Sequence, residues 1–240
     1  MTDSYILITG ASSDIGTEIA LSLSKSYKLV LSDNNEQRLA EIVQMLDKSN
    51  NHKYWQADLS KPEQAFNELS GFLAKNDITV SGIVNVAGYF AINPQKRVTL
   101  QQVTNILNIN LISAAALIKA LIKKSNKRTL KKVVFISSIS AMRGYKGLGI
   151  YSAAKSGLLS LAKALAKELA PKVNVNTIVL GALKTKTTKA IYNAEHVQNS
   201  YPLGEGNLKD VSSAVEFLIS GKSNWITGQE LIVDGGVTLI

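Results

Sequence analysis

Tyr151 and Lys155 lie four residues apart in Tyr151-Ser-Ala-Ala-Lys155, and Ser138 precedes the tyrosine by thirteen residues. Residues at i and i+4 share one face of a helix, so the polar ends of Tyr151 and Lys155 can converge. A free phenol has a pKa near ~10, and we expect the nearby ammonium to lower it into the range where proton transfer is efficient. Ser138 ends an apolar run that begins at Lys132 and is typical of a buried strand. The three groups predict a site that moves a proton to or from an alcohol or ketone oxygen.

The spacing of Tyr151 and Lys155 alone is common on helix surfaces, so its meaning depends on the rest of the chain. The apolar run Tyr5-Ile-Leu-Ile8 leads into Thr9-Gly-Ala-Ser-Ser-Asp-Ile-Gly16, and an apolar helical pattern follows. A strand, a glycine-rich turn and a helix in this order are typical of a phosphate-binding site. Gly10 would permit the tight turn, Gly16 would let the helix pack closely, and the helix N-terminus would receive a pyrophosphate.

Asp33 ends the next apolar run, Lys28-Leu-Val-Leu-Ser-Asp33, seventeen residues after Gly16. A carboxylate at this place can accept hydrogen bonds from both ribose hydroxyls of NAD and would repel the 2′-phosphate of NADP. Asp33-Asn34-Asn35 is also good turn chemistry in its own right. We predict NAD as the cofactor, with NADP as the second candidate.

In this order, the motifs resemble the short-chain dehydrogenase/reductase family over nearly the whole chain, and in particular its 3-oxoacyl-acyl carrier protein reductases. The family's Asn-Asn-Ala-Gly element is similar to Asn85-Val-Ala-Gly88, and its carboxyl-terminal signature to the stretch from Ile226 to Gly236. The resemblance implies four catalytic residues: Asn110, Ser138, Tyr151 and Lys155. It implies cofactor contacts from Tyr151 and Lys155 and from Gly10, Ser12, Ser13, Asp14, Ile15, Gly16, Asp33, Asp58, Leu59, Asn85, Ala87, Gly88, Gly181, Leu183 and Thr185. In the implied mechanism Lys155 holds ribose hydroxyls, and Asn110 keeps a water in the proton path.

Three positions depart from the family pattern. Asp14 replaces the middle glycine of the turn, where its charge would repel a pyrophosphate; we expect it to point away and cap the helix. Val86 replaces the second asparagine of Asn-Asn-Ala-Gly, and Leu180 replaces the proline that usually precedes Gly181. None of the three removes a proton-transfer group.

The element pattern predicts a single α/β domain over residues 1–240, a Rossmann-type doubly wound parallel sheet with helices on both faces. Residues 1–90 would mainly bind the cofactor, and residues 91–240 would carry the catalytic groups. We expect strands near 4–9, 28–33, 52–57, 81–86, 132–138, 173–180 and 230–233. We expect helices near 15–26, 35–48, 61–75, 99–125, 151–170 and 207–220. The poorly patterned residues 184–206 predict a lid over the substrate.

Composition narrows the class of protein. The 240 residues are 45% hydrophobic and include no cysteine, which excludes disulfides and thiolate metal sites. With only two histidines, we expect no metal site. The first residues lack an export signal, and Leu111 to Ile122 is apolar but only twelve residues long, so we expect a cytoplasmic protein with no membrane span.

The net charge is +9, from 27 basic and 18 acidic residues. The basic residues are spread over helices without an aromatic-rich groove motif, so we expect no nucleic-acid partner. A solvated surface explains them, or docking of an acidic partner such as acyl carrier protein, for which Arg128 and Lys172 lie in places comparable to the related reductases. The resemblance also implies a homotetramer or homodimer, joined through the alanine- and leucine-rich helices at 99–125 and 151–170.

Two classes of function follow. The first is an NAD(P)-dependent oxidoreductase that moves hydride between nicotinamide and a secondary alcohol or ketone, with Tyr151 as general acid and base. Its substrate is a carrier-bound 3-oxoacyl group, or a small sugar, sterol or polyol. The second is a non-catalytic cofactor-binding protein, to which only Asp14 lends weight.

Overall fold

The structure is a computed structural model that describes residues 4–123, 126, 128–189, 192 and 199–239. Within these residues, seven strands form one sheet in the order β3-β2-β1-β4-β5-β6-β7, and every neighbouring pair is parallel. The strands are β1 (Tyr5–Thr9), β2 (Lys28–Asp33), β3 (Lys53–Gln56), β4 (Val80–Asn85), β5 (Lys132–Ser138), β6 (Asn174–Leu180) and β7 (Glu230–Val233). The strand order reverses between β1 and β4, and ligands of such sheets bind beyond the carboxyl ends of the strands at this point.

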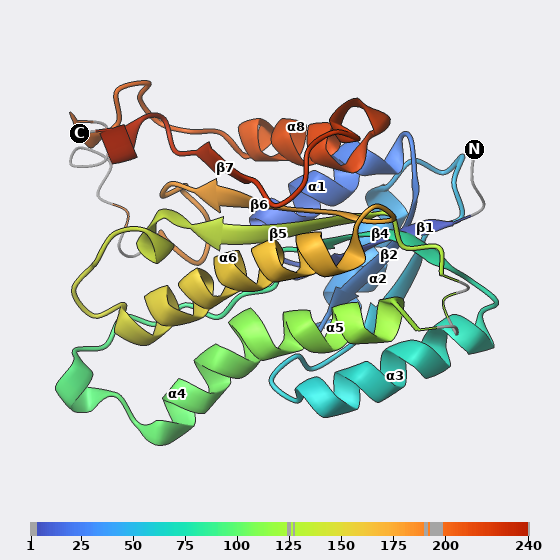
Figure 1. The fold of residues 1–240 in the computed structure, drawn as a ribbon, viewed down its shortest axis with the longest axis horizontal. Coiled ribbons are helices and arrows are strands. Elements are labelled where there is room, and N and C mark those ends of the chain that lie inside the picture. The colour runs from blue at the N-terminus through green and yellow to red at the C-terminus, as the bar shows by residue number, and fades with distance from the viewer. Residues whose placement is uncertain (1–3, 124–125, 127, 190–191, 193–198, 240) are drawn as a thin grey trace.

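Helices cover both faces of the sheet (Figure 1). Buried side chains of α1 (Asp14–Ser24), α2 (Glu36–Met45) and α8 (Leu208–Ile219) form one core with one face. Buried side chains of α3 (Pro62–Lys75), α5 (Ser113–Leu121) and α6 (Gly149–Leu169) form the other. Strand residues alternate between the two cores: Ile6 and Ile8 enter the first, and Leu7 enters the second. This arrangement confirms the predicted fold class.

The helix expected over residues 99–125 contains a break in its regular winding. It begins as α4 (Leu100–Leu107), widens into a π-helical turn at Asn108–Ile112 and continues as α5. The apolar periodicity runs through the break, so the sequence pattern does not indicate it. Such π turns are frequent at functional sites, and this one contains Asn110.

The apolar segment is longer than the twelve residues expected, because α4, the π-helical turn and α5 follow one another without a gap. Leu100–Leu121 spans 22 residues and contains an 18-residue window with a mean hydropathy of 1.4, so by length and composition alone it could cross a membrane. The core helices of soluble proteins pass the same test. Here α5 packs into the core formed by α3, α6 and the sheet, through side chains such as Leu117 and Leu121.

Candidate active site

A cavity of about 960 Å³ opens at the carboxyl edge of the sheet. Its walls come from the turn after β1, the ends of β2 and β5, the segments after β3, β4 and β6, and α6. Most of the predicted site residues line it: Gly10, Ser12, Ser13, Asp14, Ile15, Asp33, Asp58, Leu59, Ala87, Gly88, Ser138, Tyr151, Lys155, Gly181, Leu183 and Thr185. Gly16, Asn85 and Asn110 are buried behind this surface and support it.

The turn after β1 has room only for glycine at two positions. Gly10 has a φ of +64°, and a Cβ there would lie 2.7 Å from the backbone of Ala87. A Cβ on Gly16 would lie 2.2 Å from the carbonyl oxygen of Gly10. The Ser13 hydroxyl caps α1 by accepting a hydrogen bond from the Gly16 N–H at 3.0 Å. The first turn of α1 thus lies directly against the cavity.

Asp14 does not cap α1, contrary to the expectation from the sequence, because Ser13 already fills that role. Asp14 is the first residue of the helix, and its carboxylate accepts a hydrogen bond at 2.7 Å from the backbone N–H of Lys186, in the segment after β6. The side chain therefore points across the cavity mouth rather than away from it.

Two further carboxylates lie along the cavity. Asp33 ends β2, and its oxygens accept hydrogen bonds from the N–H groups of Ser12 at 3.2 Å and Asn34 at 2.9 Å. Asp58 accepts bonds from both the N–H and the hydroxyl of Ser60, and the hydroxyl bond contributes most to lowering the pKa of Asp58. Both groups are in place to meet hydroxyl or amino donors of a ligand.

A buried hydrogen-bond chain fixes the segment after β4. The Thr9 hydroxyl donates to Asn85 Oδ1 at 3.0 Å and accepts from the Ala87 N–H at 3.3 Å. Asn85 therefore supports the wall rather than entering the cavity. Gly88 follows, and a Cβ there would lie 2.9 Å from Asn110 Oδ1 and 3.3 Å from Lys155 Nζ. Only glycine lets this backbone pass so close to both groups.

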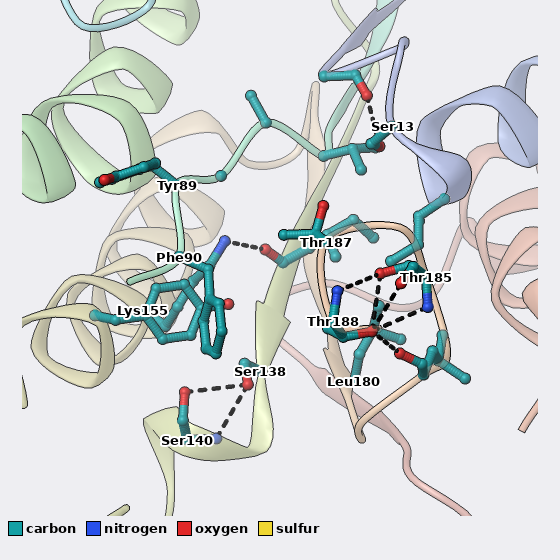
Figure 2. Close-up of a pocket in the computed structure, with 18 of the residues that line it drawn as sticks. Ser13, Tyr89, Phe90, Ser138, Ser140, Lys155, Leu180, Thr185, Thr187 and Thr188 are labelled. Carbon is teal, nitrogen blue, oxygen red and sulfur yellow. Dashed lines mark hydrogen bonds between the residues drawn. The ribbon is translucent and has the colours of Figure 1, made fainter. Parts of the chain in front are cut away.

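The predicted proton-transfer groups come together. Ser138 ends β5, and its hydroxyl oxygen accepts bonds from the N–H and hydroxyl of Ser140 at 3.2 and 3.1 Å (Figure 2). Tyr151 lies two residues inside α6, and its interaction with the Ser138 side chain lowers the pKa of Tyr151. Phe90 packs edge-on against the Tyr151 ring, with centroids 5.3 Å apart. The hydroxyls of Ser138 and Tyr151 can therefore hold one substrate oxygen between them.

Lys155 and Asn110 are the other two predicted catalytic residues, and both are buried. Lys155 is 3% exposed, and its ammonium donates to the Ile136 carbonyl at 3.0 Å and lies 5.7 Å from the Tyr151 ring centroid. Asn110 is fully buried and donates to the carbonyls of Tyr89 and Ile106. Its Oδ1 has no partner among the described residues. A buried acceptor of this kind calls for a donor such as a water or an ammonium.

Burial sets the charge state of the site. Desolvation raises the pKa of Tyr151 to about 12, and the bond with Ser138 opposes the shift only in part. Desolvation also lowers the pKa of Lys155 to about 8. We expected the ammonium to lower the pKa of Tyr151, and that expectation is wrong for this structure. Removal from water is the largest cause at both groups, so burial disfavours the charged form of each and the neutral phenol is stabilised.

Sequence reasoning did not find the residues that form the rest of the cavity. They include apolar and aromatic residues from three separate segments: Tyr89, Phe90, Ile92, Ile139, Tyr145, Leu148 and Val237. Most lie outside regular helices and strands, where no periodicity marks them. The only available signal was the cluster of aromatic residues directly after Gly88.

The predicted lid is described only in part, because residues 190–191 and 193–198 lie outside the described residues. Residues 183–189 form a compact turn in which the Thr188 hydroxyl donates to the Leu183 carbonyl and the N–H groups of Thr185 and Thr188 each bond to the other's hydroxyl (Figure 2). Tyr201 anchors the start of the segment, since its hydroxyl accepts from the Ala182 N–H at 2.7 Å.

The site fits a dinucleotide cofactor. The close backbone approaches at Gly10 and Gly16 leave the first turn of α1 accessible to phosphate, and Asp33 and Asp58 lie where hydroxyl and amino groups would need acceptors. Lys155 and the orphaned Asn110 Oδ1 lie at the other end, next to Tyr151. The residues that would hold the cofactor therefore surround one continuous cavity.

Comparisons with known proteins agree with this geometry. The family model described as enoyl-(acyl carrier protein) reductase matches residues 10–238. The 3-oxoacyl-[acyl-carrier-protein] reductase FabG of Rickettsia prowazekii is 32% identical over 245 residues, covering 100% of this chain and 99% of that protein. The human 3-oxoacyl-[acyl-carrier-protein] reductase is 32% identical over 245 residues and covers 99% of each chain.

Solved structures share the whole fold. A short-chain dehydrogenase/reductase from Brucella melitensis, described as a glucose/ribitol dehydrogenase, superposes with a TM-score of 0.90 at 26% identity, over 98% of this chain and 96% of that one. A blue fluorescent protein from a metagenomic library, solved with NADPH, has a TM-score of 0.88 at 26% identity, over 98% and 97% of the two chains.

Proposed function

The chain belongs to the short-chain dehydrogenase/reductase family and is an NAD(P)-dependent oxidoreductase, and from this premise we propose that it reduces the 3-ketone of an acyl thioester. The observation that supports this substrate is that the apolar side chains of Phe90, Ile92, Leu148 and Val237 line the same cavity as Tyr151. Such a lining accepts an acyl chain, whereas a sugar or polyol needs a polar partner for each hydroxyl that it buries. The names of the relatives, 3-oxoacyl-[acyl-carrier-protein] reductases, agree with this class.

The chain's own residues perform the proton transfer. Ser138 and Tyr151 hold the ketone oxygen, and Tyr151, kept neutral by burial, donates its proton as negative charge develops there. Bound NAD(P)H supplies the hydride that reduces the carbonyl carbon to the alcohol. Lys155 holds ribose hydroxyls, and Asn110 Oδ1 accepts from a water on the path that returns a proton to Tyr151. In the reverse direction Tyr151 must first lose its proton.

We propose NAD as the preferred cofactor. Asp33 ends β2 at the cavity wall, where its charge suits two ribose hydroxyls and opposes a 2′-phosphate. The structural relative solved with NADPH gives the counter-hypothesis. Titration of the protein with NADH and with NADPH, followed by nicotinamide fluorescence, separates the two. Tighter binding of NADPH than of NADH would show that Asp33 does not determine the cofactor preference.

The acyl group could arrive on an acidic carrier protein. The basic residues that would receive it differ from Arg128 and Lys172, which we expected from the sequence. Arg128 and Lys172 are exposed but directly precede β5 and β6, at the amino edge of the sheet. They therefore lie on the side away from the cavity of their own subunit. Lys146 and Lys186 line the cavity mouth. We propose that these two lysines attract an anionic carrier.

A homo-oligomer also remains our proposal, with a revised contact surface. Leu117 and Leu158 lie on the two helices that we expected at an interface, and both are fully buried in the core of the chain itself. Ile112, between α4 and α5, stays exposed. Further exposed apolar residues lie on the edge strand β7, at Leu231 and Ile232, and on the neighbouring segments, at Phe217 and Trp225. Exposed apolar residues at the edge of a sheet suit contact with another copy.

A comparison of substrates tests the proposed reaction. We expect kcat/KM for reduction of a 3-oxoacyl thioester such as acetoacetyl-pantetheine by NADH to exceed that for oxidation of gluconate or ribitol by NAD⁺ by about 100-fold or more, because the polyols would leave buried hydroxyls unpaired. The Tyr151→Phe variant measures the background rate. Equal or higher efficiency with the polyols would refute the acyl substrate, and binding of NADH without turnover of any ketone would favour the non-catalytic function.

A further inference from the structure

One contact joins the two walls of the cofactor cavity across 172 positions of sequence. Asp14 Oδ2 accepts a hydrogen bond from the Lys186 N–H at 2.7 Å, and Asp14 Oδ1 lies 3.9 Å from Lys186 Nζ. The Asp14 side chain is 24% exposed, whereas that of Lys186 is 84% exposed. The bond to the backbone is short and charge-assisted, so it carries most of the interaction. The longer, solvent-exposed ion pair contributes little.

The segment that Asp14 holds is a folded turn and not a loose strand. Within residues 183–189, hydrogen bonds between Thr185 and Thr188 close the turn, and the Lys189 N–H bonds to the Thr185 carbonyl at 2.8 Å. Thr185, Lys186, Thr187 and Thr188 all line the cavity, as does Asp14. Figure 2 shows this turn across the cavity from Tyr89 and Phe90. The turn is therefore one hydrogen-bonded unit, and Asp14 ties that unit to α1.

The same place must receive the diphosphate of the cofactor. The first turn of α1 presents backbone N–H groups and the positive end of the helix dipole to the cavity, both of which attract an anion. Asp14 places a carboxylate of the protein itself in this part of the cavity, where it accepts from the Lys186 N–H. A diphosphate at the first turn of α1 and the Asp14 carboxylate would thus compete for the Lys186 N–H.

We propose that Asp14 is a latch that holds residues 183–189 over the cavity and that the cofactor diphosphate displaces it by taking over the bond from Lys186. Asp14 is then a positioning residue that sets cofactor affinity. It keeps the wall folded before binding, and the cofactor must break one charge-assisted hydrogen bond to enter. A glycine at this position would supply neither effect.

Two measurements on the whole protein test the latch. The dissociation constant for NADH is obtained by fluorescence titration, and the rate of tryptic cleavage at Lys184, Lys186 and Lys189 is measured with and without NADH. For Asp14→Ala we expect about tenfold tighter NADH binding, the value of one charge-assisted hydrogen bond. We expect several-fold faster cleavage without NADH, returning to the wild-type rate at saturating NADH.

Three variants serve as controls. Glu18→Gln removes the same charge four residues further along α1 and should change neither quantity. Lys186→Ala removes the side chain but keeps the N–H, so NADH affinity should stay within about twofold. Asp14→Asn keeps an acceptor without charge and should lie between Asp14→Ala and the wild type. Thermal melting checks that each variant is folded.

The combination of outcomes distinguishes a latch from simple repulsion. Tighter NADH binding by Asp14→Ala with unchanged cleavage would mean that Asp14 only repels the diphosphate, and the latch would be refuted. Unchanged or weaker NADH binding would also refute it, whatever the cleavage rate.

Discussion

At the scale of single residues, burial decides which proton is available. Tyr151 and Lys155 are both removed from water, and their pKa values move in opposite directions, to about 12 and about 8. Tyr151 therefore remains a neutral acid at every physiological pH. Lys155 is the group of the pair that changes charge near neutrality. The spacing of the two residues predicted that they lie close together. It could not predict the directions of the two pKa shifts, because desolvation depends on residues far away in the sequence, such as Phe90, which packs against Tyr151.

The pH dependence of ketone reduction should follow Lys155. Below a pH of about 8 Lys155 carries the proton that feeds Tyr151, and above it this proton is lost. We therefore expect kcat at saturating NADH and ketone to fall as the pH rises through about 8. Steady-state rates between about pH 6 and 10 measure this. A rate that stays level beyond pH 9, or that rises through 8, would contradict the assignment.

At the scale of elements, the sequence predicted all seven strands to within one residue at each end, because most of them are short runs rich in apolar residues. It could not predict the π-helical turn that aims Asn110, since that turn interrupts the winding and not the apolar periodicity. Nor could it predict the bond from Asp14 to Lys186, which depends on the fold of an irregular segment.

His52 links two parts of the chain through hydrogen bonds that only the structure reveals. Its Nδ1 accepts from the Leu29 N–H at 3.1 Å, and its Nε2 bonds to the Asp47 carbonyl at 2.9 Å.

Stability should depend on the neutral form of His52. Burial lowers the pKa of His52 below its ordinary value of 6.5. The folded chain then binds fewer protons at this site than the unfolded chain, so its contribution to stability is present above pH 6.5 and is lost as the pH falls through the lowered pKa. We expect His52→Ala to lower the free energy of unfolding by about 1–3 kcal/mol at neutral pH.

Urea unfolding of the wild type and of His52→Ala at about pH 7.5 and 5.5 provides the comparison. The difference between the two proteins should shrink at the lower pH, because the wild type loses the contact there. A difference that grows on acidification would show that charged His52 stabilises the fold.

At the scale of the whole molecule, one cavity draws on both parts of the chain. The turn after β1 and the ends of β2 and β4 supply the cofactor end, and β5, α6 and the segment after β6 supply the chemistry. The division into residues 1–90 and 91–240 therefore remains a proposal about roles. A ligand that contacts both parts stabilises the whole fold in proportion to its affinity.

Cofactor binding should raise the melting temperature in an order set by Asp33. At 100 times its dissociation constant a ligand adds about 2.7 kcal/mol to the free energy of unfolding. At equal concentrations we expect a larger rise in melting temperature with NADH than with NADPH. For Asp33→Ser the two rises should approach each other or change order. A larger rise with NADPH in the wild type would contradict the proposed preference.

The most direct test of the account is single-turnover hydride transfer by Tyr151→Phe, with NADH affinity measured on the same samples. Phenylalanine keeps the ring that packs against Phe90 and removes only the hydroxyl. We predict a rate of ketone reduction lower by about 100-fold or more, the scale of a lost general acid, with the NADH dissociation constant unchanged within about twofold. A variant that retains more than about a tenth of the wild-type rate would contradict the central claim that Tyr151 delivers the proton.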